Sequence, residues 1–181
     1  MTSVFEELAE VVRLLESRGV RHALIGAAAM AGLGVVRASD DVDLLVVEAA
    51  VLDEGFWSPL SGRGAAVDLR RGDDADPLAG VVRLSRPGGT PIDVVVGKRP
   101  WQRDAIERAR TIRLGTVELP LIGGADLVLL KLYAGGPQDA ADVGLILASP
   151  DGEAIRAEVE ARVAVLPVES VELWRRITGG R

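Results

Sequence analysis

The chain has 181 residues, enough for a domain with a real buried core. A hydrophobic content of 48% and a charged content of 27% are typical of a globular protein, and the absence of cysteine excludes disulfides and thiolate metal sites. The net charge of −6 argues against a general binder of polyanions. The N-terminus lacks the basic start and apolar run of a signal peptide, and no apolar run approaches the roughly 20 residues that span a bilayer. We therefore expect a cytoplasmic protein without a membrane segment.

The first half of the chain predicts alternating helices and strands. Apolar residues recur every three or four positions over residues 5–17, which predicts an amphipathic helix. Strands are expected at 21–25, 41–47 and 65–71, with a small-residue helix at 27–32 and a short helix at 51–60. Residues 81–86 and 90–96 predict two strands that turn through Pro87, Gly88 and Gly89.

The second half changes from strands to helices. A helix is expected at 100–110, with proline at its first position, and a second hairpin at 111–114 and 117–121, turning at Gly115. Only helices follow, at 125–133, 137–148, 152–165 and 168–177. This order predicts the α+β class, with a mixed sheet flanked by helices over residues 1–122. Residues 123–181 are expected to form a helical C-terminal region packed on the same domain.

Three aspartates on two predicted strands form the candidate metal site. Asp41 and Asp43 are two positions apart, so on a strand their side chains point to the same face. Two like charges on one face repel each other unless a cation lies between them, and Mg²⁺ accepts one or two carboxylates together with substrate phosphates. Asp93 lies within an apolar run, where an acid is costly unless it is paired or metal-bound. An Asp-x-Asp pair is common in sequences. Without the third acid, the alternative interpretation is that the pair lies at the solvent-exposed end of a strand and binds no metal.

Two further features bear on a phosphate-containing ligand. Gly26 lies between a predicted strand and a helix, where backbone N–H groups can meet an anion; a simple tight turn is the alternative. From Arg83 to Arg113 there are eight basic and three acidic residues, a local charge of +5. This stretch is either a solvated basic face or a surface that meets a triphosphate or an RNA.

These residues together resemble a known family. Gly26 and the run Arg37-Ala38-Ser39-Asp40-Asp41-Val42-Asp43 resemble the nucleotidyltransferase superfamily with the polymerase-β-like fold, whose pattern is Arg-x-Thr-x-Asp-h-Asp with an apolar h. The helical stretch from Asp126 through Lys131 to Asp139 and Asp142 is similar to a second signature. Within the superfamily the chain resembles AbiEii-type nucleotidyltransferase toxins and their standalone relatives. The resemblance extends over about residues 21–147.

The resemblance implies a reaction and a set of roles. The reaction is Mg²⁺- or Mn²⁺-dependent transfer of a nucleoside monophosphate from a nucleoside triphosphate such as ATP to an acceptor hydroxyl. The acceptor is tRNA, a protein or a small molecule, and the resemblance favours a macromolecule. The implied metal ligands are Asp41, Asp43 and Asp93, and the implied nucleotide-binding residues are Gly26, Ala27, Arg37, Ser39, Lys131, Asp139 and Asp142. Lys131 would also act in catalysis. The alternative interpretation is that its side chain simply extends from an apolar helix to solvent. The resemblance further implies a toxin with a cognate antitoxin.

One position departs from the family pattern. Ala27 follows Gly26 where the family has glycine or serine, so a hydroxyl that would contact the terminal phosphate is missing. The alternative hypothesis is therefore a binding module of the same fold that recognises a nucleotide or a partner without turnover. A metal-dependent nuclease is a third hypothesis, because clustered acids serve those enzymes as well.

Overall fold

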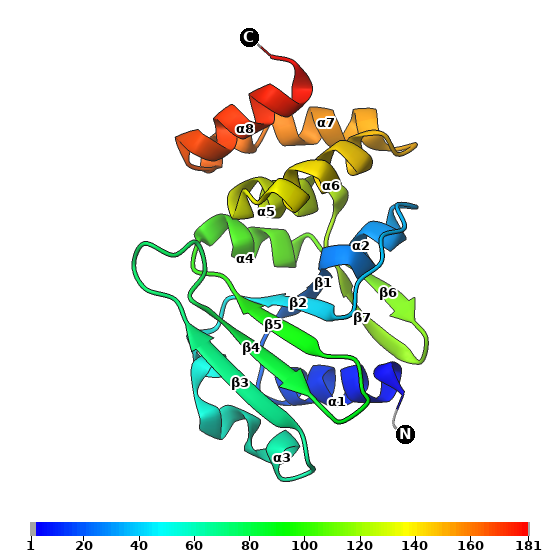
Figure 1. Cartoon of the computed structure of the whole chain (residues 1–181), viewed down its shortest axis with the longest axis vertical. Helices are drawn as coiled ribbons and strands as arrows, with labels where there is room; N and C mark the ends of the chain where they lie inside the picture. Colours follow the sequence, from blue (N-terminus) through cyan, green and yellow to red (C-terminus); the bar gives the residue numbers. More distant parts are fainter. Residues whose placement is uncertain (1–2, 181) are drawn as a thin grey trace. The chain divides into compact units, whose positions relative to one another are not determined.

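The computed structural model describes residues 3–180, which divide into two compact units (Figure 1). The first consists of the described residues of Met1–Ala28 and of Ala38–Ile122. The second consists of Ala29–Arg37 and the described residues of Gly123–Arg181. Within residues 3–180, no helix combines the length and the apolar character needed to cross a membrane.

A seven-stranded mixed sheet organises the first unit. Its strand order is β3-β4-β5-β2-β1-β7-β6, with β2 parallel to β5, β1 parallel to β7, and the other neighbours antiparallel. The strands are β1 His22–Ile25, β2 Val42–Val46, β3 Ala66–Arg71, β4 Gly80–Ser85, β5 Ile92–Val96, β6 Arg110–Leu114 and β7 Val117–Leu121. The predicted α+β class with a mixed sheet is confirmed.

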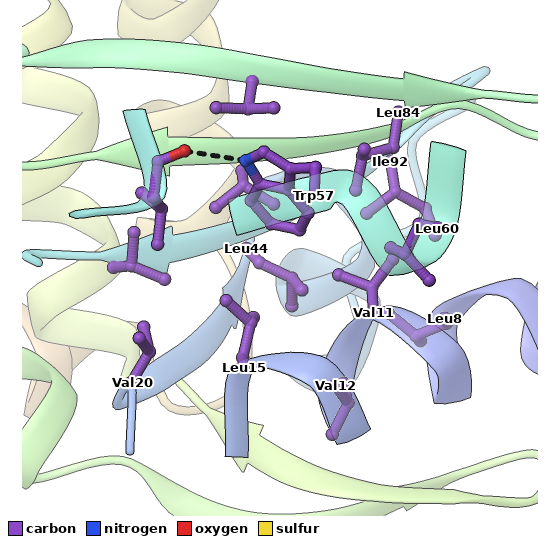
Figure 2. Packing of buried hydrophobic residues seen from close by; sticks show 14 of the residues in the cluster. Leu8, Val11, Val12, Leu15, Val20, Leu44, Trp57, Leu60, Leu84 and Ile92 are labelled. Carbon is purple, nitrogen blue, oxygen red and sulfur yellow. Dashed lines mark hydrogen bonds between the residues drawn. The ribbon is translucent and has the colours of Figure 1, made fainter. Parts of the chain in front are cut away.

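One face of this sheet packs on a hydrophobic core. The helix α1, Val4–Ser17, buries Leu8, Val11, Val12 and Leu15 against Leu44 of β2 and neighbouring strand residues (Figure 2). Side chains alternate along a strand, so every second residue of β2, β4 and β5 enters this core and the residues between them point to the opposite face. That opposite face carries the aspartates of the predicted metal site.

The segment after β2 differs from its prediction. Instead of one helix at 51–60, the chain forms the 3-10 turns η1, Ala49–Leu52, and η2, Glu54–Trp57, followed by the short helix α3, Ser58–Ser61. The Asp53 carboxylate accepts a hydrogen bond from the N–H of Gly55 and starts a new turn there. Trp57 is fully buried, and its indole N–H donates to the Val51 carbonyl at 2.7 Å (Figure 2). The core therefore fixes this segment as separate turns.

Two predicted helices end earlier than expected. In the first unit, α4 covers Pro100–Glu107 because Arg110 pairs with Leu121 as the first residue of β6. In the second unit, α7 covers Gly152–Glu160 and a separate 3-10 turn, η3 Val163–Val165, buries Val163. The remaining helices are α2 Gly26–Gly32, which continues from the first unit into the second, and α5 Gly124–Ala134, α6 Pro137–Leu147 and α8 Val168–Thr178.

Candidate functional site

Three aspartates meet on the sheet face opposite the α1 core. Asp43 of β2 and Asp93 of β5 are register partners on neighbouring parallel strands. The strand was predicted to begin at Asp41. In the structure β2 begins at Val42, so Asp41 lies one residue before the strand. One carboxylate oxygen from each of the three lies within 4.8 Å of the other two, and all three residues are partly buried. The structure thus brings the three predicted metal ligands together.

Gly26 lies directly against one of these carboxylates. Its φ is +66°, and a β-carbon built on it would lie 1.9 Å from Asp43 Oδ2. An alanine would therefore both strain the backbone and collide with the carboxylate. The glycine at the end of β1 is required for the close approach of Asp43 to the backbone. Ala27, the next residue, is buried, and it offers no polar side-chain atom here.

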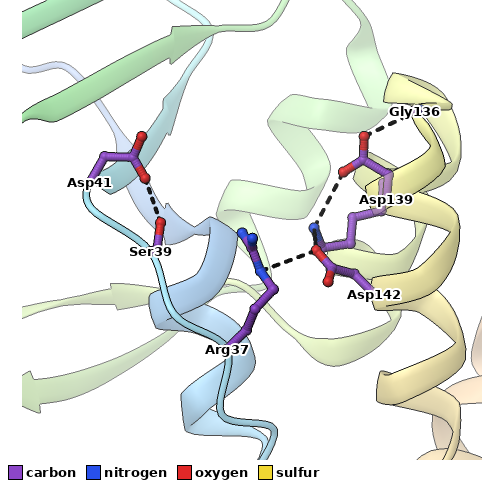
Figure 3. A network of polar contacts seen from close by, with 7 residues as sticks. Arg37, Ser39, Asp41, Gly136, Asp139 and Asp142 are labelled. Carbon is purple, nitrogen blue, oxygen red and sulfur yellow. Dashed lines mark hydrogen bonds and ion pairs between the residues drawn. The ribbon is translucent and has the colours of Figure 1, made fainter.

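Short polar contacts orient the cluster. Ser39 Oγ donates a hydrogen bond to Asp41 Oδ1 at 2.5 Å (Figure 3). Arg83 of β4 donates from Nη1 to Asp93 Oδ2 at 2.9 Å, and its Nη2 lies 3.9 Å from Asp41 Oδ2. A single guanidinium thus faces two of the three carboxylates.

The protonated form of Asp93 is more favourable than the protonated form of a solvent-exposed aspartate. Burial raises the pKa of the Asp93 carboxyl, the Arg83 guanidinium opposes this rise, and the Asp41 carboxylate adds to it. Arg70 and Asp68 have smaller effects of opposite sign on the same pKa. A carboxyl of raised pKa is better suited to accept a proton from a hydroxyl group.

The donor set fits a hard divalent cation. Asp93 Oδ1 is buried and has no hydrogen-bond partner among residues 3–180, although a buried oxygen without a partner is costly. Three clustered carboxylates without nitrogen or sulfur donors match the oxygen ligands that Mg²⁺ and Mn²⁺ accept. The residues therefore fit the metal that the sequence predicts, with Asp93 Oδ1 as a free ligand atom.

A hollow of about 360 Å³ opens beside Asp93 on the same sheet face. Its charged lining consists of Asp68, Arg70, Arg71, Asp76, Arg83 and Asp93. Binding sites for small molecules are typically about 300–1,000 Å³, so the hollow is at the small end of that range. The Asp93 carboxyl forms part of its wall.

The remaining predicted site residues form a separate network within the second unit. Lys131 of α5 is buried, and its Nζ donates to Asp142 Oδ2 at 2.6 Å and to Asp139 Oδ1 at 3.3 Å. Arg37 Nε lies 3.5 Å from Asp142 Oδ2, and Asp139 also accepts from the N–H of Gly136 at the start of α6 (Figure 3). Lys131 therefore does not extend to solvent; it is held by two aspartates.

The basic stretch of the first unit is partly neutralised by its own acids. Arg83 pairs with Asp93, while Arg86 lies 2.7 Å from Glu10. The remaining arginines on β6 are exposed. Only part of the charge that suggested a nucleic-acid surface is therefore engaged locally, through Arg83 and Arg86.

Arg83 was predicted from the sequence only as part of the basic stretch, and not as a residue of the aspartate site. A pattern that could have found it was present, because a hairpin centred on Gly88 pairs residue 83 with residue 93. The structure has this register, with Arg83 opposite Asp93 and, on the other side, opposite Asp68 of β3.

Neither a protein-family model nor a curated protein matches the sequence. The structure is similar to a solution structure of the antibiotic-resistance factor ANT(2'')-Ia and to a crystal structure of ANT(2'')-Ia in complex with adenylyl-2''-tobramycin. Their TM-scores are 0.53 and 0.54, with 12% and 13% sequence identity. The matches cover 87% and 88% of this chain and 91% and 98% of those chains. The lincosamide antibiotic adenylyltransferase LnuA gives a TM-score of 0.49 at 13% identity, covering 78% of this chain and 94% of that one.

Proposed function

We propose that this chain, whose fold is that of nucleotidyltransferases, transfers a nucleoside monophosphate from a nucleoside triphosphate to an acceptor hydroxyl and releases pyrophosphate. The observation that carries the proposal is the cluster of Asp41, Asp43 and Asp93, whose oxygens lie within 4.8 Å of one another beside the Gly26 turn. In-line phosphoryl transfer needs little more from a protein than positioned charge and a proton acceptor.

The side chains have distinct roles in this proposal. Asp41, Asp43 and Asp93 would hold Mg²⁺ or Mn²⁺, which when bound neutralises phosphate charge and polarises the phosphorus centre. Ser39 orients Asp41 through its short hydrogen bond. Asp93 would share the metal or accept the proton of the acceptor hydroxyl.

The residues that we propose to bind the nucleotide are those expected from the sequence. Gly26 and Ala27 form the turn at which the triphosphate approaches the backbone. Lys131 supplies positive charge for the leaving pyrophosphate, with Asp139 and Asp142 fixing its position. Arg37 is a second cation for the same phosphates, since its Nε is held near Asp142.

The acceptor enters through the hollow beside Asp93. Its volume of about 360 Å³ can hold a small hydroxyl compound as a whole, whereas an RNA or a protein would place only its reacting hydroxyl end there. Three arginines and three aspartates line it, so a polar molecule with several hydroxyl groups would find both donors and acceptors. The neighbour ANT(2'')-Ia, in complex with adenylyl-2''-tobramycin, supports this choice of acceptor class by analogy of fold.

The test is a labelling experiment with the purified chain. Each α-labelled nucleoside triphosphate is incubated with Mg²⁺ and with separate pools of aminoglycosides and other polyols, of total tRNA and of protein. We expect label in the polyol pool, and at least a 100-fold loss of rate in Asp43→Asn, on the order of what removing one stabilising group costs. Asp104→Asn is the matched control, because Asp104 is an exposed acid of α4. Equal rates in the two variants would refute the proposal.

The second candidate function is a binding module, which Ala27 favours. An alanine there offers no hydroxyl to a terminal phosphate, so a bound nucleotide would be held with one contact fewer. This function predicts saturable nucleotide binding that Asp43→Asn weakens, with no label in any acceptor pool and no pyrophosphate release. Cleavage of nucleic acid without pyrophosphate release would instead identify a nuclease.

A toxin role with a cognate antitoxin rests on the resemblance to AbiEii-type proteins. It predicts that induced expression of the wild-type chain arrests bacterial growth and that Asp43→Asn relieves the arrest. Normal growth with the wild-type chain at the same expression level would exclude this role.

A further inference from the structure

Arg83 occupies the place of a counter-ion at the aspartate cluster. Its guanidinium lies 2.9 Å from Asp93 and 3.9 Å from Asp41, so it already balances part of the charge that a divalent cation would balance. The side chain of Asp93 is only 14% exposed, whereas that of Arg83 is 43% exposed. The arginine is therefore the partner that is free to move away.

A guanidinium and a divalent cation compete for the same carboxylate groups, although Arg83 contacts Oδ2 of Asp93 and leaves Oδ1 without a partner. Asp93 Oδ2 is the acceptor of the Arg83 hydrogen bond, and the carboxylates of Asp41 and Asp93 belong to the cluster that fits a metal. Two cations on one carboxylate repel each other, so binding of one weakens binding of the other. Loss of Arg83 should then make the site more receptive to Mg²⁺ or Mn²⁺.

The strand register offers Arg83 a second carboxylate. Asp68 of β3 is its partner on the side away from Asp93, and the hollow of about 360 Å³ includes all three residues in its lining. Asp68 is 55% exposed and pairs with Arg70, itself 79% exposed, at 3.0 Å. An exposed pair of this kind is weak and leaves Asp68 available to a second arginine.

We infer that Arg83 is a positioning residue that competes with the divalent cation for Asp93 and turns toward Asp68 when the cation binds. The inference rests on the proposed function only in the identity of the cation site. Asp93 then has two alternative partners. It pairs with Arg83 in the absence of the divalent cation and with the cation once the cation binds.

The test measures cation binding without nucleotide, by Mn²⁺ electron paramagnetic resonance and by calorimetry with Mg²⁺. Arg83→Gln should bind Mn²⁺ about two- to fivefold more tightly than wild type, the range expected for removal of a partly exposed ion pair. Arg71→Gln is the matched control, since it removes an equal charge from the lining of the same hollow and the Arg71 guanidinium donates to the Leu52 carbonyl. Unchanged or weaker binding by Arg83→Gln, or an equal gain in Arg71→Gln, would overturn the inference.

A double-mutant cycle tests the movement toward Asp68. Asp68→Asn should weaken Mn²⁺ binding in the wild-type background and have a much smaller effect in the Arg83→Gln background. Equal effects in both backgrounds would refute that step. Should Arg83→Gln fail to fold, the Nε–H nuclear magnetic resonance signal of Arg83 in the wild type must shift when Mg²⁺ is added, and a constant signal would contradict the inference. Because none of these measurements involves transfer, they stay informative if labelling fails.

Discussion

Gly26 has a left-handed backbone conformation, and the Asp43 carboxylate occupies the space that a β-carbon at this residue would need. We predict that Gly26→Ala lowers the free energy of unfolding by about 2–3 kcal/mol, combining the cost of a left-handed alanine with displacement of Asp43. Urea unfolding measures this loss, and Mn²⁺ titration should show weakened binding in the same variant.

A second glycine separates the two costs. Gly64 has a φ of +86° and nothing within 4 Å of an added β-carbon, so Gly64→Ala carries only the backbone cost of about 1 kcal/mol. It should leave Mn²⁺ binding unchanged. If both variants lost the same stability and bound Mn²⁺ alike, close contact with Asp43 would not be the reason for glycine at residue 26.

His22 predicts a pH dependence of stability. Its ring is buried, and this burial lowers the pKa of His22 below its ordinary 6.5. Below pH 6.5 the unfolded chain therefore binds more protons than the folded chain, and stability falls with decreasing pH until the folded pKa is passed. Urea unfolding at pH 7.5 and 5.5 should show a smaller decrease for His22→Gln than for wild type. Equal decreases would mean that His22 is not the titrating group.

At the residue scale, the sequence predicted the acids of the site but not their counter-ion. Asp93 stood out because an acid in an apolar strand needs a partner. Arg83 did not stand out, because a single arginine on a strand of a hairpin is ordinary on an exposed face. Only the register, which depends on the turn at Gly88, places it opposite Asp93.

At the scale of elements, α5 and α6 are joined by a buried charge. We predict that Lys131→Met lowers the free energy of unfolding by about 3 kcal/mol, because Asp142, whose side chain is 3% exposed, loses its 2.6 Å partner. Lys98→Met, at an exposed lysine that donates to main-chain carbonyls, should cost less than about 1 kcal/mol. Chemical unfolding compares the two. The double variant Lys131→Met with Asp142→Asn should recover part of the loss, whereas additive losses would argue against the pair.

Elements with a strong local pattern were predictable and short irregular ones were not. The helix α1 and both hairpins follow from apolar periodicity and from glycine at the turns. The turns η1 and η2 do not, because they are shaped by burial of Trp57 and by the Asp53 carboxylate, which no periodicity reveals.

At the scale of the whole molecule, the chain passes between its two compact units three times. Residues 29–37 belong to the second unit although the C-terminal helices begin only after residue 122. The composition does not reveal that residues 29–37 belong to the second unit. These residues are rich in small side chains, as is the start of α2 in the first unit. The sequence-based division at residue 122, with both parts in one domain, stays a proposal.

The strand order also leaves two open edges, β3 and β6. Unpaired edges are templates for association with another chain, and native proteins protect them with charge. Strand β6 carries the exposed Arg110 and Arg113, and β3 carries the exposed Asp68, Arg70 and Arg71. Two copies that met along β6 would bring both arginines of each copy into one ladder. The two β6 arginines therefore disfavour pairing of two copies through β6.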